Sequence, residues 1–179
     1  GVANMRKWVS GPGWVLSGLL SVLTTAALAS PPMILATTGM VGDTVRAVGG
    51  ECVTTQVLMG PGVDPHLYQA SASDVQRFQN AALIAFNGFG LEGQLDNVLT
   101  RFADRRPTLA FAEAADRVGP RTAIAGQGSY TSDPHLWMDA RLWAQGIAPL
   151  VEALSMVVPS CEGLFNARAA QHIERLHAV

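Results

Sequence analysis

The sequence has no cluster of basic residues and no short metal-binding motif. Only 15% of its 179 residues are charged, the formal net charge is −2, and the 12 lysines and arginines form no cluster. A nucleic-acid partner needs a basic surface that neutralises phosphates, so we expect none. Cys-x-x-Cys, His-x-x-x-His, a nucleophile elbow and a Ser-His-Asp spacing are also missing. Any metal site must therefore be assembled by the fold.

The first residues have the composition of a secretory signal peptide. Arg6 and Lys7 give a basic start, residues 14–28 form an apolar stretch too short for a comfortable membrane span, and Ala27-Leu28-Ala29 gives a small-x-small cleavage site. Glycines and serines interrupt the stretch and no stop-transfer charges follow it, which disfavours the alternative of a retained anchor. We expect a soluble product outside the cytoplasm.

The chain has two cysteines, Cys52 and Cys161. An exported chain meets conditions in which a disulfide persists. Nothing in the sequence places the two residues near each other, so two outcomes stay open: a disulfide, or Cys52 as a small buried side chain.

The mature part alternates strand-like and helix-like segments. Apolar runs predict strands at 33–37, 53–59, 82–86 and 108–111, helical spacing predicts helices at 43–48, 73–78, 91–103, 140–157 and 161–179, and 113–132 is polar and irregular. Repeated βα units predict an α/β fold, a parallel sheet covered by helices on both faces. Ligands bind at the carboxyl ends of the strands in such a sheet.

One five-residue pattern occurs twice, as Asp64-Pro65-His66-Leu67-Tyr68 and as Asp133-Pro134-His135-Leu136-Trp137. Each proline fixes its own φ and holds the preceding aspartate extended, so the backbone that leads into the histidine is nearly preset. The aspartate can cap the turn or accept the ring N–H that faces away from a metal. A single loop histidine is usually only solvated, but the duplication predicts that the two neutral imidazoles bind one divalent transition metal.

A rival motif lies between Gly88 and Gly93. The stretch Gly88-Phe89-Gly90-Leu91-Glu92-Gly93 matches the dinucleotide-binding pattern G-x-G-x-x-G, follows a predicted strand and has Glu113 further along. Glu92 would place a carboxylate against the pyrophosphate, and the motif follows the third strand instead of the first. We therefore favour a glycine-rich turn, with a dinucleotide site as the alternative.

Several segments together resemble a known family: 38–43, 58–68, 73–74, 87–88 with 91–93, and 133–137 with Asp139. They are similar to the N-terminal lobe of the metal-binding solute receptors of ABC transporters, in the manganese/zinc/iron branch called cluster A-I or TroA-like. The resemblance covers nearly all of the mature chain, and the segment 59–68 is its most specific motif. It implies two lobes joined by a long helix and a metal held between them by four side chains, of which His66 and His135 belong to this lobe.

The first residues themselves indicate an upstream extension at 1–4, before the candidate initiator Met5, and the signal peptide at 5–29. The resemblance implies that 30–158 form the N-terminal α/β lobe and 159–179 the start of the connecting helix. The family's two other ligands lie in the second lobe, so the sequence resembles a truncated receptor. Gly90 departs from relatives that often carry histidine there. Asp64, Pro65, Asp133 and Pro134 would shape the loops around the two ligands.

The function that the resemblance implies is the capture of Mn, Zn or Fe for an ABC transporter permease in the cytoplasmic membrane, without catalysis. The receptor would be a monomer when complete. The residue directly after the expected cleavage site is Ser30 and not a cysteine, which favours a free periplasmic protein over a lipoprotein. The alternative is an exported metal- or dinucleotide-dependent enzyme that uses the Gly88–Gly93 loop.

Overall fold

The computed structural model describes residues 30–119 and 132–179. The extension expected at 1–4, the signal peptide expected at 5–29 and most of the irregular stretch expected at 113–132 lie outside the described residues.

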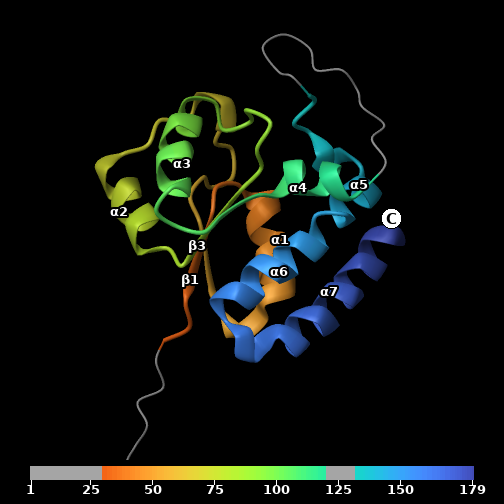
Figure 1. The fold of residues 1–179 in the computed structure, drawn as a ribbon. Coiled ribbons are helices and arrows are strands. Elements are labelled where there is room, and N and C mark those ends of the chain that lie inside the picture. Colours follow the sequence, from red (N-terminus) through yellow and green to blue (C-terminus); the bar gives the residue numbers. More distant parts are fainter. Residues whose placement is uncertain (1–29, 120–131) are drawn as a thin grey trace, which may run out of the picture.

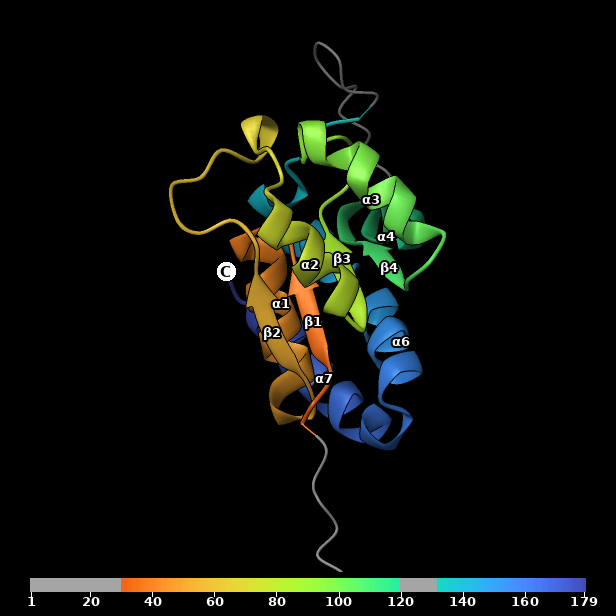
Figure 2. The same cartoon turned by 90° about the vertical axis from the view of Figure 1, so that its left-hand side faces the viewer.

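Four parallel strands form a single sheet at the centre of the described chain. The strands are β1 (Met33–Ala36), β2 (Thr54–Val57), β3 (Leu83–Phe86) and β4 (Thr108–Ala110), and their order in the sheet is β2-β1-β3-β4. Because all four run the same way, their carboxyl ends meet at one edge, which is the upper edge in Figure 2. This arrangement confirms the predicted parallel α/β fold.

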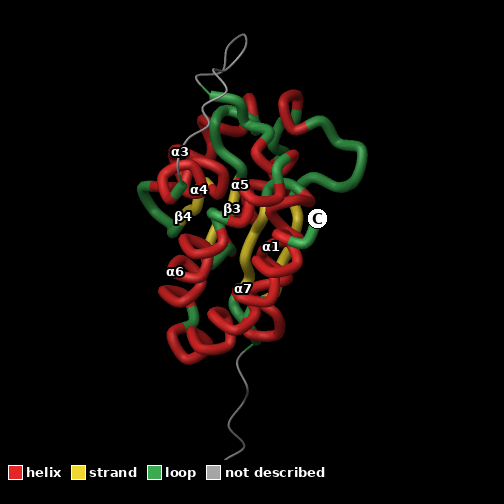
Figure 3. Tube along the Cα trace, turned by 90° about the vertical axis from the view of Figure 1, so that its right-hand side faces the viewer, coloured by secondary structure: helices red, strands yellow, loops and turns green. Residues whose placement is uncertain are grey.

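Helices cover both faces of the sheet. They are α1 (Gly39–Gly49), α2 (Ala72–Asn80), α3 (Asp96–Ala103), α4 (Phe111–Val118), α5 (Ala140–Ala144), α6 (Ile147–Val157) and α7 (Glu162–His177). Helices α2 and α3 lie on one side, and α1, α6 and α7 lie on the other (Figure 1). Figure 3 shows this second layer in front of the strands. Short 3-10 helices join the elements at Gly50–Cys52, Pro65–Leu67, Gly93–Leu95, Leu136–Met138 and Pro159–Cys161.

Each central strand contributes side chains to two hydrophobic cores. Ile34 and Ala36 face the core beneath α1 and α6, whereas Leu35 between them faces the core beneath α2 and α3. The same alternation holds along β3, where Leu83 and Ile84 take opposite faces. Successive strand residues point to opposite faces, so a strand covered on both sides must be apolar throughout. This requirement explains the unbroken apolar runs in the sequence.

The structure corrects two of the predicted boundaries. A helix, α4, occupies the start of the stretch expected to be irregular, because Phe111 and its alanines are buried against the sheet. The single helix expected over 140–157 is divided into α5 and α6 at Gln145 and Gly146. Gly146 lies directly against the ring of Phe111, and an added Cβ would overlap that ring. The buried ring of Phe111 thus leaves no room for a side chain at position 146.

A disulfide joins Cys52 to Cys161, with the two Cα atoms 6.4 Å apart. Cys52 lies just after α1 and Cys161 just before α7, so the bond fastens the two helices at one end. Phe165 on α7 is fully buried in the core shared with α1 and α6. The structure therefore resolves the question that the sequence left open.

Within residues 30–119 and 132–179, no helix has both the length and the apolar character needed to cross a bilayer.

Removal of this disulfide should destabilise the fold. The bond links residues 109 positions apart, and closing a loop of that size restricts the unfolded chain strongly. We expect Cys52→Ser combined with Cys161→Ser to lower the free energy of unfolding by about 2–5 kcal/mol. Urea unfolding under oxidising conditions measures this change. A reductant should weaken the parent protein and leave the double variant unaffected, and equal unfolding midpoints for both oxidised proteins would contradict the prediction.

Candidate metal centre

The first histidine loop follows β2. The carboxylate of Asp64 accepts a hydrogen bond from the backbone N–H of His66 at 2.9 Å and so caps the short 3-10 helix Pro65–Leu67. Pro65 occupies the first position of that helix, where its missing N–H is not needed. The aspartate and proline of the repeated pattern therefore set the backbone from which the His66 side chain projects.

The second histidine loop uses its aspartate twice. Asp133 Oδ1 accepts from the backbone N–H of His135 at 3.0 Å and lies 2.6 Å from Nδ1 of the same imidazole. The backbone hydrogen bond and then the ring hydrogen bond lower the pKa of the Asp133 carboxyl, so this group is ionised at neutral pH. An ionised carboxylate favours a proton on Nδ1, which leaves Nε2 of His135 as the nitrogen able to bind a metal.

The two imidazoles lie beside each other at the carboxyl edge of the sheet. Their ring centroids are 5.9 Å apart and the ring planes form an angle of 63°. With metal–nitrogen bonds of about 2.1 Å, two imidazoles that share one ion have centroids no more than roughly 6.5 Å apart. The observed spacing fits a shared ion. Among residues 30–119 and 132–179, no group of three or more His, Cys, Asp or Glu residues could hold a metal.

The glycine-rich loop after β3 uses its backbone donors internally. The carboxylate of Glu92 is fully buried and accepts hydrogen bonds from the Thr37 hydroxyl at 2.7 Å and from the backbone N–H groups of Asn87 and Gly88 at 2.6 and 3.1 Å. The N–H of Phe89 donates to Glu113. A pyrophosphate would need such N–H groups. Because carboxylates occupy them, the loop is the glycine-rich turn that we favoured.

Burial shifts the ionisation of Glu92. It raises the pKa of the carboxyl above its ordinary value, although the hydrogen bonds from Asn87, Thr37 and Gly88 oppose this rise. Three donors converge on a group that water cannot reach. Buried carboxyl groups are tolerated when they are hydrogen-bonded in this way.

A second carboxylate anchors the first histidine loop to α2. The Tyr68 hydroxyl donates to Asp74 at 2.8 Å, and Asp74 forms a capping box with Ser71 at the start of the helix. Burial, followed by this hydrogen bond, raises the pKa of Tyr68 to about 12. Burial also tends to raise the pKa of Asp74, but hydrogen bonds from Ser71 and Tyr68 and the charge of Arg77 lower it overall. Sequence analysis missed this anchor, although Ser71 and Asp74 have the capping-box spacing.

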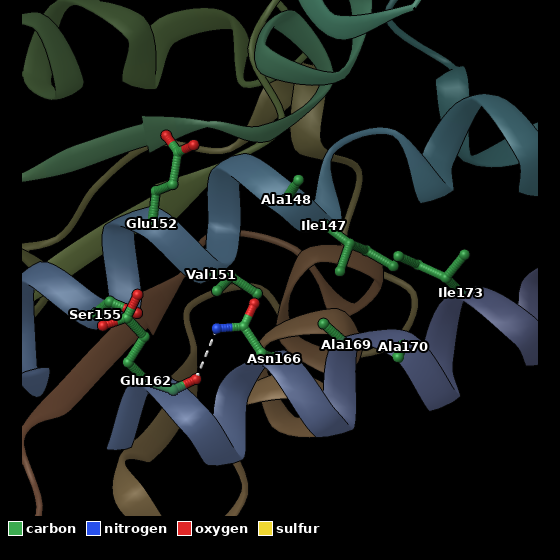
Figure 4. Close-up of a pocket in the computed structure, with 10 residues that line it drawn as sticks. All are labelled: Ile147, Ala148, Val151, Glu152, Ser155, Glu162, Asn166, Ala169, Ala170 and Ile173. Carbon is green, nitrogen blue, oxygen red and sulfur yellow. Dashed lines mark hydrogen bonds between the residues drawn. The ribbon is translucent and has the colours of Figure 1, made fainter. Parts of the chain in front are cut away.

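Two of the hollows on the described chain adjoin the first histidine loop and the α6–α7 pair. One, of about 420 Å³, borders the first histidine loop between Met40, Gly60 and Pro65. The other, of about 360 Å³, lies between α6 and α7, where Ile147, Val151 and Ile173 provide its apolar wall and the Asn166 side chain donates to the Glu162 carbonyl at 3.0 Å (Figure 4). No histidine or cysteine lines either hollow. The paired imidazoles remain the strongest candidate site.

Comparisons with known proteins show what the chain is similar to. Residues 34–179 match the family described as "Zinc-uptake complex component A periplasmic". The manganese-binding lipoprotein MntA of Bacillus subtilis is 34% identical over 143 residues, which are 80% of this chain and 46% of MntA. The zinc-binding protein TroA of Treponema pallidum is 34% identical over 151 residues, 84% of this chain and 48% of TroA. The iron-binding protein YfeA of Yersinia pestis is 25% identical over 170 residues, 89% of this chain and 52% of YfeA.

The solved structure of the periplasmic zinc-binding protein TroA has the same fold. It superimposes with a TM-score of 0.76 and 32% identity, over 83% of this chain and 52% of TroA. The fold and the paired histidines define the class, an α/β lobe with two imidazoles side by side at its strand ends. The chain belongs to the periplasmic zinc-uptake component A family of metal-binding proteins. It spans about half the length of the curated relatives that it matches.

The Asp74 anchor predicts a stability that depends on pH. The folded-state pKa of Asp74 lies below its ordinary value, so the ionised form stabilises the fold above about pH 4, and this contribution is lost as the pH falls through the folded-state pKa. We expect Asp74→Asn to lower the free energy of unfolding by about 1–3 kcal/mol at pH 7. The difference from the parent should shrink at pH 3.

Chemical unfolding at the two pH values measures this effect. Asp43→Asn is the matched control, because Asp43 forms an exposed ion pair with Arg46 three residues along its helix. Such pairs contribute little, so its loss should change stability by less than about 0.5 kcal/mol. An Asp74→Asn effect that is equal at pH 7 and pH 3 would show that the charge has no part in it.

Proposed function

We propose that this chain forms the N-terminal lobe of an extracytoplasmic receptor that captures a divalent transition metal, Mn, Zn or Fe, for an ABC importer. His66 and His135 are the ligands that the lobe contributes. The observation that carries this proposal is the 5.9 Å spacing of two imidazoles whose loops follow different parts of the sheet. Residues 159–179 begin the helix that connects the lobe to a second one.

The chemistry of the two side chains supports a transition metal as cargo. Neutral imidazole is a preferred ligand of zinc, iron and other first-row transition metals. The names of the relatives span manganese, zinc and iron, so the proposal extends to this class of ions. Capture requires a full set of protein ligands around the ion, whereas a catalytic site keeps one position open for water. The proposed receptor binds and releases its metal ion and catalyses no reaction.

The names of the relatives support a cellular place and a partner for the proposed receptor, and one relative is named an ABC transporter substrate-binding lipoprotein. MntA is named a lipoprotein, and TroA is named a periplasmic protein. The disulfide between Cys52 and Cys161 supports an oxidising compartment for this chain, because cytosolic thiols are kept reduced. We infer that the chain is exported to the periplasm, where its partner is the permease in the cytoplasmic membrane.

The principal test removes both candidate ligands. We expect the parent chain to bind Zn(II) in isothermal titration and the combined His66→Ala and His135→Ala variant to lose more than about tenfold in affinity. Mn(II) and Fe(II) are titrated in parallel. The substitution of His172→Ala with His177→Ala, on α7, is the matched control and should leave binding unchanged. Equal affinity of the parent and the His66/His135 variant would refute the site, and NAD binding that survives both substitutions would favour the dinucleotide alternative.

A second test addresses the carboxylate behind His135. Asp133→Ala should weaken Zn(II) binding by about 10-fold or more, because the imidazole loses the partner that fixes its tautomer. Asp139→Ala is matched to it: this aspartate lies in the same segment and caps α5 through the N–H groups of Arg141 and Leu142. Competition with a chromogenic chelator measures both affinities. The role of Asp133 would be disproved if the two variants lost affinity equally.

A further inference from the structure

We propose that Asn87 and Gly93, at the two ends of the loop after β3, are positioning residues that set the distance between His66 and His135. This inference rests on the proposed metal site. It also gives a purpose to the glycine-rich motif, which a metal receptor does not otherwise need. The loop that looks like a dinucleotide-binding turn serves as a common support for both histidine loops.

Asn87 holds the second histidine loop. Its side chain is fully buried, and its Nδ2 donates to the Pro134 carbonyl at 2.9 Å and to the Gly88 carbonyl at 3.0 Å. Pro134 immediately precedes His135 and is itself buried. If the Asn87 amide were removed, the carbonyl groups of Pro134 and Gly88 would lose these hydrogen bonds, at a cost of about 1–3 kcal/mol for each. The loop that carries His135 is therefore tied to the end of β3.

Gly93 supports the first histidine loop by direct contact. Its φ is +52°, and a Cβ added to it would overlap the carbonyl oxygen of His66. The backbone of the glycine-rich loop thus packs against the peptide unit of the candidate ligand itself. Any side chain at this position would push the His66 backbone away from the loop.

The backbone between these two contacts is held by the fold. Glu92 accepts from the N–H groups of Asn87 and Gly88, and its other donor is Thr37 at the end of β1. Glu92 therefore holds the loop against the ends of two neighbouring strands. Through Asn87 and Gly93, the loop in turn holds both histidine loops in place. Preorganised ligands lose less freedom when they bind, so a fixed spacing raises the affinity of a two-histidine site.

The first experiment measures Zn(II) affinity by titration in the parent, in Asn87→Ala and in Asn166→Ala. We expect Asn87→Ala to lose about 10-fold or more, as is typical when a group that orients a ligand is removed. Asn166 is the matched control, because its amide also donates to a backbone carbonyl but lies on the exposed face of α7. Urea unfolding without metal is run on every variant, so that each titration is made where the variant is folded.

A double-substitution cycle distinguishes positioning from general destabilisation. If Asn87 places His135 beside His66, Asn87→Ala should have no further effect on Zn(II) affinity once His135→Ala has removed one ligand. A loss of the same size in both backgrounds would overturn the proposal, because it would show an effect independent of the pair.

Gly93 provides an independent variant should Asn87→Ala fail to fold. Gly93→Ala introduces both a strained φ and a clash with His66, whereas Gly50→Ala introduces the same strain at φ +51° and meets only the end of the Arg168 side chain, away from both histidine loops. We expect Zn(II) affinity to fall about 10-fold in Gly93→Ala and to change little in Gly50→Ala. Equal losses in the two variants would mean that strain alone is responsible.

The outcomes separate this inference from the proposed function. If the parent binds Zn(II) and the combined His66→Ala and His135→Ala variant does not, the site is real. Unchanged affinity in both Asn87→Ala and Gly93→Ala would then overturn only the positioning role. If the parent itself binds no metal through the two histidines, the proposed function fails first and the positioning role fails with it.

Discussion

A single buried carboxylate, that of Glu92, ties together the ends of the two central strands. It accepts hydrogen bonds from Thr37 after β1 and from Asn87 and Gly88 after β3. Removing a carboxyl group from water is costly, and burial raises the pKa of Glu92 accordingly. The three donors offset this cost only while the loop keeps its shape. The buried carboxylate therefore requires this loop conformation, and its hydrogen bonds in turn stabilise that conformation.

The loop that Glu92 holds also contacts both histidine loops. Gly93 follows Glu92 directly and packs against the His66 peptide, and Asn87 donates to the peptide before His135. Neither contact involves an imidazole ring. The loop can thus fix the distance between the two histidines without contacting either ring. It also explains why a spacing typical of nucleotide binding occurs in a protein whose relatives bind metals: glycines allow close backbone approach in both settings.

Those parts of the fold that depend on local patterns could be predicted from the sequence. The apolar runs gave β1 and β3, because strands covered on both faces are apolar throughout. The rule that ligands bind at the carboxyl ends of parallel strands anticipated that the two Asp-Pro-His loops would lie at the same edge, and the structure places the rings of His66 and His135 there, 5.9 Å apart. That the two histidines bind a metal stays a prediction.

The missed features all depend on contacts between distant residues. Asn87 and Pro134 are 47 positions apart, and Cys52 and Cys161 are 109 apart, so no local pattern reveals either contact. Gly146, which precedes α6, packs against the ring of Phe111, a residue that a sequence window around Gly146 does not contain. Tertiary packing decides such positions, and local propensity only permits them.

Orientation and spacing of the candidate ligands are controlled by different parts of the chain. Within the second loop, Asp133 orients the His135 ring through Nδ1, a contact between residues two positions apart. The spacing of the two loops depends instead on Asn87, Gly93 and the buried Glu92, all outside the repeated pattern. A duplicated short motif can supply two well-oriented imidazoles, but only a separate rigid element can bring them within reach of one ion. We infer that the glycine-rich loop is that element in this fold. Its backbone N–H groups accordingly donate to carboxylates of the protein and not to a bound ligand.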